Sequence, residues 1–229
     1  MDLNLKLNDT VLKSVTAHRH LGITLTNDLR WSTHVSNVVC AANKKLGLLK
    51  YHGSYLNYQQ KSTFYLNFVR PVIEYGSLVY SNLTVKDILK LENVQRRAAI
   101  FCLSAHWRTP SSSLLTELGW DTLERRRQFS SYMYIFKIIR ELLPTYILQI
   151  PILSRRISIY GTRSTDSSYV FEKPKCKTIN YSKSFFPTAI NGWSALPQDV
   201  KDCISFGELK SKLKHTLNLI PLILTPIII

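Results

Sequence analysis

Apolar residues recur at steps of three and four along much of the chain, and this period is typical of amphipathic helices. The stretch from Phe64 to Ala99 contains two such patterns, separated by a short break. Pro71 lies inside the first pattern and predicts either a kink near Arg70 or a helix that ends there and restarts, because proline removes a backbone donor and crowds the preceding turn. The periodicity as a whole predicts three packed helices over residues 33–52, 58–80 and 84–103.

Residues with capping chemistry mark where these helices and the later ones begin and end. A short polar side chain followed three residues later by an acid or amide can satisfy the first free N–H groups of a helix. Gly53 and Gly119 are expected to end helices, since glycine is common just after the last turn. The expected capping pairs are Asn57 with Gln60, Thr84 with Asp87, Asp121 with Glu124, and Ser205 with Glu208. We expect the helix after Asp121 to run through Leu143.

The first residues alternate instead with a period of two. Leu3, Leu5 and Leu7 are separated by polar residues, which predicts a β-hairpin that continues to about Leu25. A two-stranded ribbon is only marginally stable in water, so we expect helices to cover it.

The expected fold class is therefore mainly α with a small N-terminal β-hairpin, a helical bundle and a second helical region. Residues 1–30 form the hairpin, 31–106 the bundle and 107–217 the second region, which includes a basic irregular segment at 154–184. Residues 218–229 are an apolar tail that contains two prolines and is too short to cross a bilayer. We expect no membrane span.

Charge narrows the choice of partner. The 229 residues include 30 Lys and Arg against 15 Asp and Glu, which gives a net charge of +15. Such a chain attracts polyanions, with nucleic acid as the first candidate and an anionic membrane as the second.

The four cysteines are too far apart to form a local zinc site. Cys40 and Cys102 fall among apolar helical positions, so we expect them to be buried. Free cysteines fit a reducing compartment, and the N-terminus lacks the pattern of a signal peptide, so an intracellular location, nuclear or cytoplasmic, is expected.

Candidate nucleic-acid contacts are basic residues on helix surfaces and in the irregular segment, where cations alternate with aromatic residues. Each has an alternative role: complementing a helix dipole, facing solvent at a helix start, or lying in an ordinary loop. The candidates are Lys44, Lys45, Arg70, Lys90, Arg96, Arg97, Arg125, Arg126, Arg127, Arg163, Lys173, Lys175 and Lys177.

A series of short motifs resembles one protein family. The order is His20-Leu21-Gly22, Leu29-Arg30-Trp31 with His34, Phe68-Val69-Arg70-Pro71, Ile73-Glu74-Tyr75, Val94-Gln95-Arg96-Arg97, Leu118-Gly119-Trp120, Trp193 and Leu196-Pro197. This order is similar to the region downstream of the polymerase palm in reverse transcriptases of jockey-like, non-LTR (LINE-type) retrotransposons, and it covers roughly residues 12–217. Two positions depart from the family, because Tyr80 stands where it usually has Trp, and Ala195 interrupts its Trp-Asn-Ser-Leu-Pro run.

The resemblance implies a palm edge over 1–30, a thumb over 31–106 and a post-thumb domain over 107–217. It also implies binding of template and primer, as RNA, RNA–DNA hybrid or DNA, beside the missing palm and fingers. In the family, two Mg²⁺ ions held by palm carboxylates carry out the chemistry. This chain has no Asp-Asp pair, so we expect no cofactor and no polymerase activity from it alone, with Mg²⁺ bound only in the complete enzyme.

A second interpretation is an inert helical protein-interaction module derived from a mobile element, in which the charge serves only solubility. The positions of Arg96, Arg97, Arg125, Arg126 and Lys173 would discriminate between the two. If these residues lie on separate faces with no common groove, the second interpretation gains support.

Overall fold

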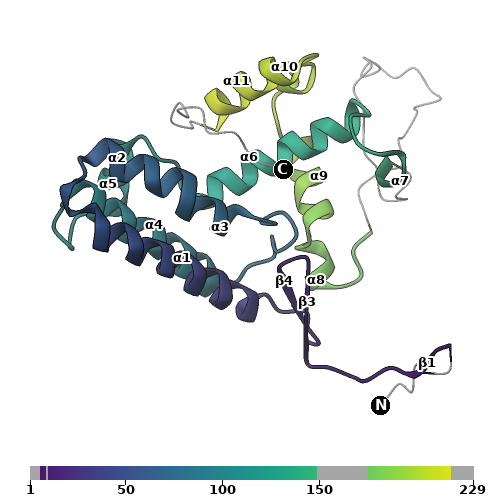
Figure 1. Ribbon diagram of the computed structural model, residues 1–229. Coiled ribbons are helices and arrows are strands. Elements are labelled where there is room, and N and C mark those ends of the chain that lie inside the picture. Colours follow the sequence, from purple (N-terminus) through teal and green to yellow (C-terminus); the bar gives the residue numbers. More distant parts are fainter. Residues whose placement is uncertain (1–5, 9, 149–174, 218–229) are drawn as a thin grey trace.

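The computed structural model describes residues 6–8, 10–148 and 175–217 and shows a mainly helical protein (Figure 1). The predicted mainly-α class is confirmed. The N-terminal strands form two short antiparallel pairs instead of one hairpin: β1 (Lys6–Leu7) with β2 (Thr10–Val11), and β3 (Ala17–His20) with β4 (Ile23–Thr26). The turn between β3 and β4 places Leu21 and Gly22 at positive φ, which keeps this hairpin tight.

A helical bundle follows the second hairpin. Its elements are α1 (Ser32–His52), the 3₁₀ turn η1 (Gly53–Tyr55), α2 (Tyr58–Phe64), the π-helical turn η2 (Tyr65–Val69), α3 (Arg70–Glu74), α4 (Val85–Leu103) and α5 (Ser111–Leu118). The expected interruption near Arg70 is confirmed: the wide turn of η2 ends at Val69, and α3 begins at Arg70 with Pro71, which has no N–H for the regular hydrogen-bond ladder, in its first turn. The continuous helix expected up to residue 80 ends at Glu74.

Helices α1 and α4 run in the same direction, with α2, η2 and α3 returning between them. Ser32 Oγ donates to Asp87 Oδ2 at 2.7 Å near the start of both helices, and Arg97 Nη2 donates to Asn43 Oδ1 at 2.7 Å further along. Val85, the first residue of α4, is 74% exposed and does not contribute to this interface. The core between the helices contains Val35, Ala42, Leu49, Tyr65, Ile73, Leu91, Val94 and Ala98.

Three of the four capping pairs are confirmed. Asn57 and Gln60 bond reciprocally, Thr84 Oγ1 accepts the N–H of Asp87, and Ser205 Oγ accepts the N–H of Glu208. The fourth was wrong by one residue, since Thr122 caps the helix by accepting the N–H of Arg125 at 3.2 Å while Asp121 is buried. That helix, α6, spans Leu123–Ile139 and does not reach Leu143.

A second core forms around α6. The remaining helices are α7 (Thr145–Leu148), α8 (Ile179–Ser182), α9 (Phe185–Ser194), α10 (Gln198–Lys201) and α11 (Phe206–Thr216), and α9 and α11 pack against α6. Phe136, Ile190 and Trp193 are buried here. The first core includes Leu114, Trp120 and Leu123, so its packing extends beyond residue 106.

Aromatic and polar contacts attach the chain after α5 and the β3–β4 hairpin to the bundle. Trp120 stacks on Tyr65 with ring centroids 4.3 Å apart, and its indole N–H donates to Ser62. The β3–β4 hairpin is attached to the bundle by the N–H of Thr24, which donates to Nδ1 of His34, and by Tyr75 Oη, which donates to the carbonyl of Leu21. Over the described residues, no helix is both long and apolar enough to cross a membrane. The apolar tail at 218–229 lies outside them.

Candidate nucleic-acid interface

Two of the predicted contact residues, Arg70 and Arg126, are buried around Glu74. Arg126 binds both carboxylate oxygens, through Nε to Oε1 and through Nη2 to Oε2 at 3.0 Å, and Nε of Arg70 lies 3.8 Å from Oε2. Burial lowers the pKa of Arg70. Burial also acts to lower the pKa of Arg126, but the hydrogen bonds and charge of Glu74 outweigh it and raise that pKa. Both guanidinium groups are therefore buried against a partner within the fold and are withdrawn from contact with a phosphate.

Lys90 and Arg96 also make contacts within the protein. Lys90 Nζ donates to Asp87 Oδ1 at 2.9 Å. Arg96 Nη2 donates to the carbonyl oxygens of Trp107 and Thr109, and so fixes the loop after α4 to the side of that helix. These cations are largely used by intramolecular partners.

The arginines chosen to discriminate between the two interpretations do not share a groove. Arg96 faces the loop after α4, Arg97 faces Asn43 on α1, and Arg126 faces Glu74, whereas Arg125 lines a cavity. This distribution favours the interaction-module interpretation for these particular residues. Arg163 and Lys173 lie outside the described residues, and Lys175 and Lys177 are exposed in irregular chain before α8.

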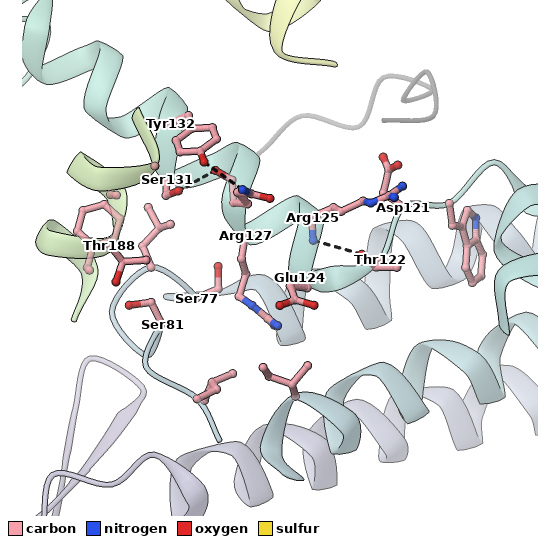
Figure 2. Close-up of a pocket in the computed structure, with 18 of the residues that line it drawn as sticks. Ser77, Ser81, Asp121, Thr122, Glu124, Arg125, Arg127, Ser131, Tyr132 and Thr188 are labelled. Carbon is pink, nitrogen blue, oxygen red and sulfur yellow. Dashed lines mark hydrogen bonds between the residues drawn. The ribbon is translucent and has the colours of Figure 1, made fainter. Parts of the chain in front are cut away.

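A cavity of about 790 Å³ lies between the bundle and the second core (Figure 2). The three consecutive arginines at 125–127 have different surroundings, because successive helical residues point about 100° apart. Arg125 and Arg127 line the cavity, whereas Arg126 is buried in the protein. Figure 2 shows Arg127 extending into the space between α6 and the loop of Ser77 and Ser81.

The cavity carries both signs of charge and several hydroxyl groups. The Ser81 hydroxyl is buried and has no hydrogen-bond partner among the described residues. Glu124 also lines the wall, and its backbone N–H donates to Oε1 of Glu92 at 3.1 Å. Burial raises the pKa of Glu92, although this hydrogen bond and the positive charge of Arg127 act to lower it. A cavity of this composition can hold a small polar group, but its acids oppose a simple phosphate site.

A group of exposed cations lies at one end of the bundle. Lys44, Lys45 and Lys50 are exposed on the last turns of α1. Because α1 and α4 are parallel, the last turns of α4 reach the same end, at the left of Figure 1 and away from the β3–β4 hairpin. We call this region, residues 44–58 and 96–108, the distal end of the bundle.

The distal end lies within two stretches of sequence that contain no acidic residue, 29–73 and 93–116. Arg97 is exposed there, and the guanidinium of Arg108 lies 4.7 Å from the ring centre of Trp107. Sequence reasoning missed Arg108. The two acid-free stretches were a signal in the sequence, but only the parallel packing of α1 and α4 brings them together.

Within the described residues, no group of three or more His, Cys, Asp or Glu side chains could hold a metal ion. The expectation that Cys40 is buried was wrong, since it is exposed, while Cys102 is buried as expected.

Comparison of the chain with protein-family models, curated proteins and solved structures found no match. Membership of the retrotransposon reverse transcriptases is therefore a proposal that rests on the order of motifs in the sequence.

Proposed function

We propose that this chain is the thumb and post-thumb part of a LINE-type reverse transcriptase and that it holds template RNA or an RNA–DNA hybrid. The motif order supports the family, and the observation that carries the binding is the acid-free, cation-bearing distal end of the bundle. There Lys44, Lys45, Lys50 and Arg97 are exposed with no carboxylate on the same segments.

The physical basis is electrostatic. Phosphates are attracted to clustered lysine and arginine, and binding releases the counterions condensed on the nucleic acid. An acid among the cations would reduce this attraction, as Asp87 does for Lys90. In this proposal the chain grips nucleic acid but catalyses nothing, and Mg²⁺ belongs to the complete polymerase.

The test is the salt dependence of binding to a labelled RNA–DNA hybrid between 50 and 200 mM salt. The variant Lys44→Gln/Lys45→Gln/Lys50→Gln should weaken binding at least about tenfold and reduce the slope of log K against log salt by about two to three units. The matched control is Lys13→Gln/Lys210→Gln/Lys214→Gln, which removes the same charge elsewhere. A flat salt dependence, or equal losses in the two variants, would contradict the proposal.

The second candidate function is a helical protein-interaction module whose charge serves solubility. The observation in its favour is that Arg70, Arg96, Arg97 and Arg126 all bind partners within the chain. It predicts that the RNA–DNA hybrid binds weakly at 50 mM salt and no better to the native chain than to the lysine variant.

A further inference from the structure

Three tyrosines close together in the sequence are more than half exposed at one corner of the distal end. Tyr51 is 80% exposed at the end of α1, Tyr55 is 97% exposed in η1, and Tyr58 is 53% exposed at the start of α2. Removing a large aromatic ring from water lowers the free energy of the system. A cluster of exposed rings at a single corner is therefore unusual unless a partner covers it.

The backbone that carries these rings is held firmly. Gly53 is buried against Phe101, so close that an added Cβ would lie 3.2 Å from that ring. The N–H of Leu56 donates to the carbonyl of Gly53, and the reciprocal Asn57–Gln60 cap fixes the start of α2. The corner therefore presents its rings from a rigid support, which lowers the entropic cost of binding.

The charge around the corner indicates which kind of partner covers it. Lys50 is exposed next to Tyr51, the ring of His52 meets Tyr51 edge-on at 4.7 Å, and no acid occurs in residues 29–73. Rings beside cations match a single-stranded nucleic acid, because its phosphates take the cations and its unpaired bases stack on the rings. A duplex hides the faces of its bases and cannot use the tyrosines in this way.

We propose that Tyr51, Tyr55 and Tyr58 form a stacking platform for the bases of a single-stranded nucleic acid. This platform rests on the proposed function for its phosphate contacts and adds to it a preference for unpaired bases. The lysines give the attraction to any polyanion, whereas the tyrosines distinguish a strand with accessible bases from one without.

The experiment compares two labelled 12-nucleotide strands, an oligouridine RNA and an abasic strand of equal charge, by fluorescence anisotropy with the full chain. The native chain should bind the RNA at least about tenfold more tightly than the abasic strand, since stacking contributes substantially for each base. Tyr51→Ala/Tyr55→Ala/Tyr58→Ala should lose that preference and bind both strands as the native chain binds the abasic one.

Two control variants separate stacking from other effects. Tyr51→Phe/Tyr55→Phe/Tyr58→Phe keeps the rings and should keep the preference. Tyr146→Ala removes another exposed tyrosine, on α7, and should change neither affinity. Because all four side chains are exposed, circular dichroism should show an unchanged fold in each variant.

The outcomes also separate this inference from the proposed function. If the native chain binds both strands equally and the alanine variant matches it, the platform is wrong while the lysine grip stands. If neither strand binds at 50 mM salt, the proposed function and the platform are both overturned. If the alanine variant instead loses binding to phosphatidylserine-containing vesicles and keeps its base preference, the tyrosines face a lipid surface and the platform is overturned.

Discussion

The guanidinium of Arg126 on α6 binds the carboxylate of Glu74 at the end of α3, 52 residues earlier in the chain. This pair joins the helical bundle to the second core, and Nε of Arg70 lies 3.8 Å from Oε2 of the same carboxylate. Removing one partner of a largely buried ion pair is costly, because the other charge stays in a poorly solvated position.

We therefore expect Arg126→Ala to lower the free energy of unfolding by about 3 kcal/mol. The measurement is urea denaturation followed by circular dichroism. Arg125→Ala, on the same helix but exposed, is the control and should change stability by less than about 0.5 kcal/mol. Similar shifts in both variants would show that the Glu74 contact does not hold the two parts together.

A second prediction concerns the close packing of α9 on α6. An added Cβ at Gly192 would lie 2.6 Å from Oη of Tyr132, which is buried and accepts a hydrogen bond from Gln128. Gly192→Ala should destabilise the protein by about 1–3 kcal/mol through overpacking, and Tyr132→Phe in that background should recover part of the loss.

Gly47 offers a matched comparison for this substitution. It lies within α1, and an added Cβ would meet nothing within 4 Å. Gly47→Ala should stabilise the protein by up to about 1 kcal/mol, because alanine restricts the unfolded chain and favours the helix. Thermal melts of the two alanine variants should therefore shift in opposite directions, and shifts in the same direction would contradict the packing described at Gly192.

The third prediction is a loss of stability at mildly acidic pH through His34. Burial, together with the positive charge of Arg19, lowers the pKa of His34 below its ordinary value of 6.5. The unfolded chain therefore binds the proton more readily, so the stabilisation is complete above pH 6.5 and decreases as the pH falls towards the folded-state pKa. Protonation would also remove the acceptor that Nδ1 offers to the N–H of Thr24.

Chemical denaturation at pH 7.5 and 5.5 measures this effect. The native chain should be less stable at the lower pH, and His34→Gln should show a smaller difference between the two conditions. His52→Gln, at an exposed position, should leave the difference as it is in the native chain. An equal pH dependence in the native chain and in His34→Gln would rule out His34 as the cause.

The fourth prediction is a split in thiol reactivity. Burial raises the pKa of the Cys102 thiol to about 12 and also raises the pKa of Cys203, whereas Cys40 and Cys176 are exposed. Because the thiolate is the reactive form, a disulfide reagent at pH 8 should modify two thiols quickly and the other two only after denaturation. The double variant Cys40→Ser/Cys176→Ser should lose the fast phase, and its persistence would mean that the buried thiols are accessible.

The sequence by itself determined the local features of this protein. The helical period, the caps at Asn57, Thr84 and Ser205, the stop at Gly119 and the break before Pro71 depend on chemistry within a few residues, and the structure has all of them. The cap at Asp121 was misplaced by one residue, because Thr122 has the same chemistry and the choice depends on the burial of Asp121 by the fold.

Only the tertiary structure decided what each cation does. Arg125, Arg126 and Arg127 look alike in the sequence, yet a rotation of about 100° per residue turns the middle one towards Glu74 and leaves the others on the cavity wall. The basic distal end likewise depends on the parallel packing of α1 and α4, which brings together two acid-free stretches that are 19 residues apart in the sequence. Side-chain partners at such separations are set by the packing of the whole chain, which local patterns do not encode.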